Sequence, residues 1–230
     1  MFEKLNIYVR KIKRAKRIKK SKSPIAPYLK KDFGVELNYK LWTTKGARFS
    51  ASHRNRVKNS LSSQTIGYLS AYLIIINLVH IYNLPYFAQL SSFELGFTTT
   101  ALSIIILLYS QFENANNYAI KSEKFHQCSL EIAELYNELR MVKTFKSITN
   151  KEYRINGISK QYDMILKQYE NHRPIDSLDF QKQKPDYFKL SKLKVRFIII
   201  KKYFIIKFKY HLLIYGPIIL FIIYQIKNMK

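Results

Sequence analysis

The sequence predicts an all-α membrane protein: a two-helix transmembrane hairpin with a cytoplasmic helical extension and a candidate third membrane segment near the C-terminus. Two uncharged stretches lead to this prediction, residues 64–82 and 95–112, which are 19 and 18 residues long. A helix needs about 20 residues to cross a hydrocarbon layer ~30 Å thick. The 230 residues also include only six glycines and six prolines, which favours long helices over a turn-rich β fold.

The balance of charge is strongly basic, with a formal net charge of +25 and a pI near 10.0. A chain so cationic needs an anionic partner, either nucleic acid or the headgroups of a lipid bilayer. We expect residues 1–39 to form a basic N-terminal arm, since nine of the thirteen residues in 10–22 are Lys or Arg. The arm either lies on anionic lipid or binds nucleic acid, and its position ahead of a membrane span favours lipid.

The flanking charges predict how the hairpin is oriented in the membrane. Cytoplasmic loops are enriched in Lys and Arg, and the loop between the two spans contains neither. We therefore expect a multi-pass protein of the inner membrane, with the N-terminus and both ends of the hairpin in the cytoplasm. The basic residues at the membrane surface are predicted to be Arg48, Arg54, Arg56 and Lys58, with Lys121 and Lys124 after the second span.

Small and polar residues follow one face of each predicted span. Their spacings of three, four and seven residues place each set on one helical face. Such a face either lets two helices pack closely or lines a pore in an oligomer, because a mid-span amide is costly against lipid. The residues are Ser63, Gly67, Ser70 and Asn77 on the first span, and Thr99, Ser103 and Ser110 on the second.

Beyond the second span, residues 113–146 and 152–172 are predicted to form two cytoplasmic helices. The first has apolar residues at alternating spacings of three and four, which make a heptad seam. The seam either joins subunits of an oligomer as a coiled coil or packs on the chain's own second helix. Its residues are Phe125, Cys128, Ile132, Leu135, Leu139 and Val142.

Residues 181–230 mix basic and apolar side chains and are expected to associate with the membrane. Within them, residues 211–226 carry no charge, and these 16 residues are slightly short for a span. Gly216 and Pro217 are expected to kink a helix there. The segment is either an in-plane amphipathic helix followed by a third span, which we favour, or wholly peripheral.

The residue types that carry most enzymatic chemistry are not grouped in this sequence. The glycines are scattered, no Cys-x-x-Cys or His cluster has metal-binding spacing, and the single cysteine, Cys128, lies on the apolar seam. His172 and Asp176 are four residues apart, but Pro174 lies between them, so we interpret this stretch as a helix C-terminus followed by a charged loop. We expect neither an enzyme nor a catalytic residue, metal or cofactor.

Several stretches, in their order along the chain, resemble one family of bacterial proteins. They are the basic entry helix KGARFSASHRNRVKNSLSSQTIGYLSAYLIIINL, the second apolar span, the stretch AIKSEKFHQCSLEIAELYNELR with its Lys-x-Glu-x-x-His-x-Cys start, and ISKQYDMILKQYENHRPID. Together they resemble the SLATT domain, the SMODS and SLOG-associating two-transmembrane effector domain. The resemblance covers residues 40–179, so we place a SLATT-like domain at residues 40–180.

The resemblance implies a membrane effector of an antiviral conflict system that forms a pore and kills or arrests an infected cell. It implies a homo-oligomer and a partner encoded nearby: a nucleotide second-messenger synthase, a nucleotide sensor or a reverse transcriptase. The cytoplasmic cations available to an anionic nucleotide signal are Lys121, Lys124, Arg140 and Lys143, unless these form a solvated helix face. The alternative is a membrane anchor or scaffold without a pore, whose basic arms recruit a partner enzyme or nucleic acid.

Overall fold

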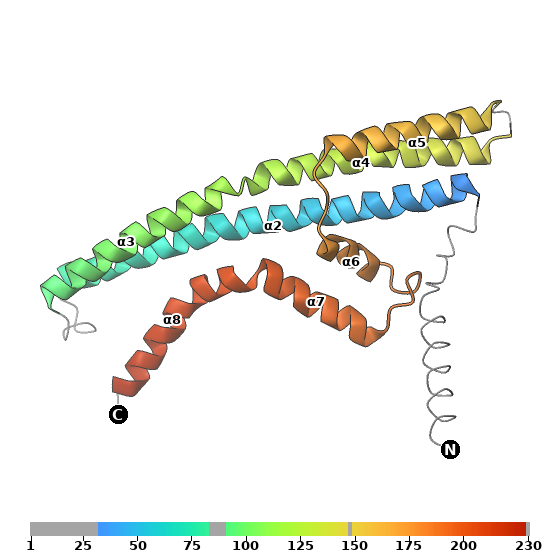
Figure 1. The fold of residues 1–230 in the computed structure, drawn as a ribbon. Helices are drawn as coiled ribbons and strands as arrows, with labels where there is room; N and C mark the ends of the chain where they lie inside the picture. Colours follow the sequence, from blue (N-terminus) through green and yellow to red (C-terminus); the bar gives the residue numbers. More distant parts are fainter. Residues whose placement is uncertain (1–31, 83–90, 147–148, 229–230) are drawn as a thin grey trace, which may run out of the picture.

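The computed structural model of the chain describes residues 32–82, 91–146 and 149–228 (Figure 1). All regular secondary structure in these ranges is α-helical, which confirms the predicted all-α fold class. Most of the predicted N-terminal arm, and most of the loop that joins the two spans, lie outside the described residues. The helices are α2 (Phe33–Ile81), α3 (Ser92–Ala115), α4 (Tyr118–Thr144), α5 (Lys151–Gln168), α6 (Pro174–Lys182), α7 (Lys192–Ile206) and α8 (Phe208–Asn228).

Helix α2 is the longest described element and runs unbroken into the first predicted span. Its 49 residues extend for about 73 Å at a rise of about 1.5 Å per residue. Helices α3 and α4 return along it in the opposite direction (Figure 1). They are separated only at Asn116 and Asn117, where Asn117 takes a left-handed conformation with a φ of 51°. The hairpin therefore continues as an antiparallel pair of helices beyond the predicted spans.

The end of the hairpin away from the predicted spans has a compact apolar core. All six residues of the predicted α4 seam are buried, and five of them pack with Leu37 and Leu41 of α2 and with Ile158 and Tyr162 of α5. The hydroxyls of Thr44 and Tyr162 lie 2.7 Å apart across the contact between α2 and α5. The chain itself thus covers the seam, which agrees with packing on its own helices rather than with a seam between subunits. The seam residues are Phe125, Cys128, Ile132, Leu135, Leu139 and Val142.

Helix α6 packs across α2 beside an aromatic cluster. The ring of Trp42 stacks on Phe188 at a centroid separation of 5.7 Å and meets the ring of Phe180 edge-on at 5.1 Å. Phe180 lies directly over Gly46, and a Cβ added to Gly46 would overlap the Phe180 ring. Glycine is therefore required for α6 to approach α2 this closely.

The apolar ends of α2 and α3 correspond to the predicted transmembrane hairpin. Both helices are long and apolar enough to cross a membrane. Large apolar side chains on them point outward, such as those of Ile74 and Ile105, which are each 59% exposed. Thr65 and Thr99 are buried, and each donates its hydroxyl to a carbonyl of its own helix. The outward apolar surface suits contact with lipid tails, which are equally apolar.

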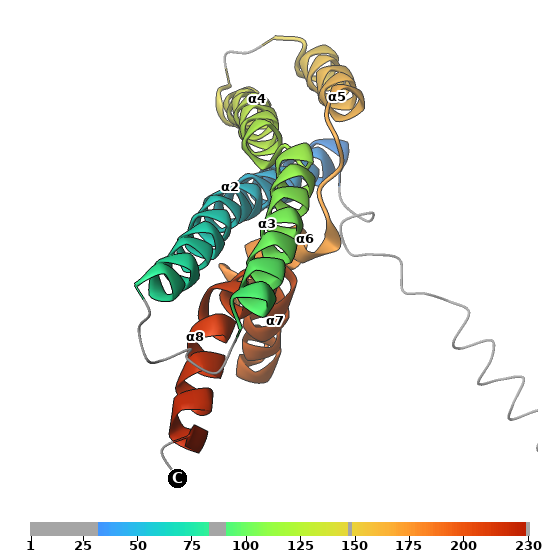
Figure 2. The same ribbon diagram turned by 90° about the vertical axis from the view of Figure 1, so that its left-hand side faces the viewer.

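The C-terminal segment forms two helices that meet at a sharp bend. Helices α7 and α8 are inclined by 66° at Lys207, and together they form a candidate third membrane span (Figure 1). Figure 2 shows both helices at the opposite end of the view from α4 and α5. The residues predicted to kink a helix, Gly216 and Pro217, lie inside α8, which continues through both of them. A proline removes one backbone donor, which a membrane helix tolerates. The bend at Lys207, in contrast, lets α7 and α8 each contact α2.

We expect Gly46→Ala to destabilise the packing of α6 on α2, because the new methyl group overlaps the Phe180 ring. Overpacking of this kind costs about 1–3 kcal/mol. The measurement is thermal unfolding of the detergent-solubilised chain, followed by the fluorescence of Trp42, its single tryptophan. Gly157→Ala is the matched control, since nothing lies within 4 Å of a Cβ built there. An unchanged transition in Gly46→Ala would contradict this packing of α6.

Candidate functional site

Three buried carboxylates connect the C-terminal helices to the hairpin and to one another. Asp176 and Asp179 of α6 and Glu113 of α3 are 2%, 5% and 6% exposed, and each contacts a basic side chain of another helix. The chain has 15 acidic residues against 40 basic ones, so acidic groups are scarce. Because burying a charge is costly unless it is paired, these contacts mark a specific polar site. We call it the junction site, made of Arg54, Glu113, Asp176, Asp179, Lys202 and Lys209.

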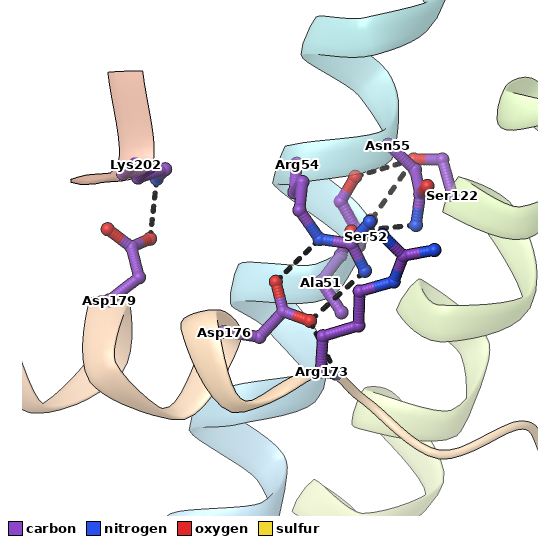
Figure 3. A network of polar contacts seen from close by, with 9 residues as sticks. All are labelled: Ala51, Ser52, Arg54, Asn55, Ser122, Arg173, Asp176, Asp179 and Lys202. Carbon is purple, nitrogen blue, oxygen red and sulfur yellow. Dashed lines mark hydrogen bonds and ion pairs between the residues drawn. The ribbon is translucent and has the colours of Figure 1, made fainter. Parts of the chain in front are cut away.

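The central contact of the junction site is a two-pronged ion pair between Arg54 of α2 and Asp176 of α6 (Figure 3). Arg54 Nε donates to Oδ1 of Asp176 at 2.7 Å, and Nη2 donates to Oδ2 at 3.1 Å. The same Oδ2 accepts the backbone N–H of Arg173 at 2.8 Å, where α6 begins. Negative charge near a helix N-terminus is favoured by the helix dipole. Asp176 therefore stabilises the start of α6 and also binds that helix to α2.

One turn further along α6, Asp179 joins that helix to α7. Its carboxylate lies 2.7 Å from Nζ of Lys202 in α7 and 2.9 Å from Nζ of Lys182 in α6. Burial acts to raise the pKa of Asp179, but hydrogen bonds from the two ammonium groups outweigh it and hold that pKa below its ordinary value. Asp179 is therefore ionised at neutral pH, and two cations share its single negative charge.

The third carboxylate, Glu113, lies at the end of the second predicted span. It accepts hydrogen bonds from Nζ of Lys209 at 2.5 Å and from the hydroxyl of Tyr210 at 2.9 Å, both in α8. Nearby on α2, Nζ of Lys58 lies 5.5 Å from the centre of the Tyr118 ring. Burial, together with nearby cations, lowers the pKa of Lys58 to about 8. The environment of Lys58 thus opposes its positive charge.

A second buried arginine, Arg48, has no carboxylate partner among the described residues. Its Nη2 donates to Oδ1 of Asn171 at 3.2 Å, and its guanidinium lies over the Phe125 ring at 5.6 Å. Its Nε and Nη1 make no hydrogen bond within the part of the chain that the structure describes. Burial lowers the pKa of His172, and the Arg48 charge lowers it further. This part of α2 therefore carries uncompensated positive charge inside the protein.

The structure places most of the predicted membrane-surface cations between helices. Arg48, Arg54 and Lys58 are buried, and only Arg56 of the four is exposed. The structure differs from the expectation at three positions, because α4 and α6 pack against this basic stretch of α2 and cover it. These three basic side chains therefore contact other helices of the protein and not the membrane surface.

The predicted polar face of the spans is only partly covered. The Asn77 amide donates to the Leu73 carbonyl of its own helix at 3.0 Å, and the Ser103 hydroxyl donates to the Thr99 carbonyl at 2.7 Å. These groups are thus satisfied without a partner helix, which lowers their cost next to lipid. By exposure the seven residues fall into three sets: exposed Ser63, Gly67 and Ser103; half-buried Ser70, Asn77 and Ser110; and buried Thr99.

Two of the residues that the sequence analysis considered for catalysis, and set aside, make structural contacts. Asp176 is held by Arg54, and Cys128 lies in the apolar core, where burial raises the pKa of its thiol. Among the described residues, no group of three His, Cys, Asp or Glu side chains is placed to hold a metal ion. The junction site is a set of contacts between helices, which join α6, α7 and α8 to one another and to the hairpin.

The sequence expectations missed α6 and with it the junction site. We expected a helix C-terminus and a charged loop at residues 170–176, and α5 does end just before them, at Gln168. A new helix then begins at Pro174, with Asp176 in its first turn. Proline at the first helical position followed by an acidic residue is a common helix start, so this signal was present. The partner of Asp176 was not deducible, because Arg54 lies 122 residues away.

The fold and the junction site define an all-helical membrane protein whose helical bundle is joined to a transmembrane hairpin by buried ion pairs. The chain belongs to the family described as SMODS and SLOG-associating 2TM effector domain family 5, whose model matches residues 30–223. This match confirms the resemblance and makes the chain a membrane effector domain of the two-transmembrane type. The match also covers the C-terminal helices, beyond residues 40–179. No curated protein and no solved structure matches the chain.

We expect Asp176→Asn to release α6 from α2, because the buried Arg54 guanidinium loses its charged partner. Breaking a buried pair from one side costs about 3–5 kcal/mol. The measurement is limited proteolysis of the solubilised chain at residues 183–191, next to α6. The matched control is Asp163→Asn, which changes an exposed acidic residue on α5. Equal protease resistance of Asp176→Asn and the unmodified chain would show that this pair does not hold α6.

The burial of Lys58 predicts a pH-dependent stability. Its pKa is about 8 in the folded chain and 10.5 in the unfolded reference, so the unfolded chain binds the extra proton between these values. The folded chain therefore gains stability as the pH rises from about 8 to about 10.5. We expect Lys58→Met to melt a few degrees above the unmodified chain at neutral pH, with a smaller difference in alkaline buffer.

The control for this titration is Lys160→Met, which changes an exposed lysine of α5. Its melting temperature relative to the unmodified chain should not depend on pH in the same range. A difference for Lys58→Met that stays constant from neutral to alkaline pH would show that the Lys58 ammonium is not penalised by its surroundings.

Proposed function

We propose that the chain is an antiviral effector that assembles as a homo-oligomer in the bacterial inner membrane, with its N-terminus in the cytoplasm. On activation the paired spans open a pore, the membrane potential collapses, and the infected cell dies or stops growing. Membership of a two-transmembrane effector domain family supports the effector role. The observation that carries the mechanism is the continuity of α2.

Helix α2 contributes to every part of the protein that such a mechanism needs. Its first half forms the apolar core with α4 and α5, its middle provides Arg54 of the junction site, and its end forms the first span. An unbroken helix transmits rotation and tilt, because its backbone hydrogen bonds resist sharp bending. A change in how α4, α5 or α6 packs on α2 is therefore able to move the span.

The outer face of the first span supports assembly with a second copy of the chain. Gly67 is exposed, and nothing lies within 4 Å of a Cβ built on it. Ser63, one turn before it, is also exposed. Small residues let two helix backbones approach closely, so this surface favours a contact between subunits. In that arrangement the half-buried amide of Asn77 faces the pore or the neighbouring subunit, which avoids its cost against lipid.

A cavity next to α4 offers a binding place for a nucleotide signal. Its volume is about 300 Å³, and its lining includes Lys121, Lys124, Phe125 and Tyr169. Ammonium groups beside aromatic rings suit a nucleotide, because its phosphates are anionic and its base stacks. The signal would come from a sensor or synthase encoded nearby, such as a second-messenger synthase or a reverse transcriptase. Opening nearly all pores from a nearly closed population needs about 5.5 kcal/mol of tighter binding to the open form.

The test is the membrane potential of bacteria that express the chain with and without its neighbouring genes, read with a voltage-sensitive dye. We expect depolarisation before growth arrest. Gly67→Leu should abolish most of the depolarisation, because the larger side chain keeps a second helix away. Asn77→Leu should leave the pores assembled but alter the leak through them. Ile105→Leu, on the exposed apolar surface of α3, is the control and should leave the depolarisation unchanged.

An unchanged potential at full membrane insertion, with the neighbouring genes present and phage added, would reject the pore. The chain would then act as a membrane anchor or scaffold that recruits a partner enzyme or nucleic acid through its basic arms. Nucleic-acid binding of this kind weakens steeply with salt, which gives that alternative its own measurement.

A further inference from the structure

A second cavity lies beside the bend between α7 and α8, and of its lining residues only Arg54 also appears in the pore proposal. Its volume is about 250 Å³, and it is bounded by α2, by the end of α6 and by α7. Apolar side chains such as Ile206 form part of its wall. The remaining side chains are mainly cationic or titratable, namely His53, Arg54, Lys182, Lys202 and Lys207.

The charges around this cavity do not balance. Arg54 is paired with Asp176, whereas Lys182 and Lys202 share the single carboxylate of Asp179. Lys207 also lines the cavity, is exposed, and forms no ion pair with any residue that the structure describes. Four cations thus meet two carboxylates, which leaves an excess of two positive charges.

The surroundings of His53 indicate the same positive potential. Burial lowers the pKa of His53, and the charges of Lys202 and Lys207 lower it further, against the opposite effect of Asp179. The imidazole is therefore neutral at neutral pH and supplies a hydrogen-bonding group without adding charge. An anion in the cavity would reduce the potential that all of these groups experience.

We propose that this cavity binds a phosphate group, held by Lys202 and Lys207 with His53 as a further hydrogen-bonding partner. The phosphodiester of a phospholipid carries one negative charge at neutral pH, which offsets half of the excess positive charge, and a phosphate monoester, with a charge of about −1.5 to −2, offsets most of it. Lysine ammonium groups bind phosphate oxygens through short, charge-assisted hydrogen bonds. The inference goes beyond the pore proposal and does not depend on it.

The position of the cavity favours the phosphate of an anionic phospholipid. Lys209, two residues after Lys207, bonds to Glu113 at the end of the second predicted span, which places the bend near the membrane boundary. Phe204 and Phe208 lie on either side of the bend with ring centroids 5.0 Å apart, and both are exposed. At a membrane surface such aromatic side chains insert below the headgroups while nearby lysines stay among them. A bound headgroup would therefore hold the bend between α7 and α8 at the membrane boundary.

The experiment is a thermal-unfolding titration of the full chain in neutral detergent, followed by Trp42 fluorescence. The probes are short-chain phosphatidylglycerol, short-chain phosphatidylcholine and ATP. We expect phosphatidylglycerol to raise the melting temperature more than phosphatidylcholine does. Lys207→Glu should weaken the apparent Kd about tenfold, the effect of losing one charge-assisted contact. Lys160→Glu, the same charge reversal at an exposed position of α5, should leave the Kd unchanged.

The outcomes separate the two sources of phosphate. If ATP gives the shift that Lys207→Glu removes, the site binds phosphate from a soluble nucleotide instead of from lipid. If no probe shifts the unmodified chain, or if Lys207→Glu and Lys160→Glu weaken binding equally, the proposal is wrong. Since this assay detects binding without any leak, its result is independent of the depolarisation experiment.

Discussion

The ion pair between Arg54 and Asp176 is the central contact by which the C-terminal helices α6, α7 and α8 dock on the hairpin. Because Asp176 lies in the first turn of α6, one carboxylate determines both where that helix begins and where it docks. The following contacts take their positions from it: Phe180 reaches the space over Gly46, and Asp179 meets α7. A buried ion pair adds little net stability, because desolvation offsets the attraction. We infer that its role here is specificity, because a docking shifted along α2 would leave the buried Arg54 and Asp176 charges unpaired.

Positive charge is in excess inside this protein as well as on its surface. Arg48 is buried without a carboxylate, Lys58 has a lowered pKa, and Lys182 shares one carboxylate with Lys202. This follows from the composition, since 40 basic residues have only 15 acidic residues available as ion-pair partners. This excess favours anionic ligands, and the two cavities described above both have lysines in their walls. The same excess supports both proposals, the nucleotide signal beside α4 and the phosphate at the bend between α7 and α8.

Helices marked by a regular spacing of residues or by an uncharged stretch were predictable from the sequence. Contacts between distant segments were not. The uncharged stretches gave the two membrane helices, and the spacing from Phe125 to Val142 gave the buried face of α4. The spacing did not show which surface covers that face, because a heptad seam has the same pattern whether it packs on the same chain or on another subunit. The junction site combines residues that are 122 and 96 positions apart, beyond any local pattern. The bend at Lys207 was not predicted, because the contacts of α7 and α8 with α2 leave no local pattern in the sequence.

The left-handed Asn117 gives the two legs of the hairpin different mechanical properties. The leg formed by α2 has no break over its 49 residues, while the other leg is divided by Asn116 and Asn117 into α3 and α4. The ladder of backbone hydrogen bonds along the hairpin is thus interrupted in only one leg, and bending there disrupts fewer bonds than bending α2. A change in the angle of α3 would therefore leave α4 in the apolar core, whereas a change in the angle of α2 would move every helix that packs on it.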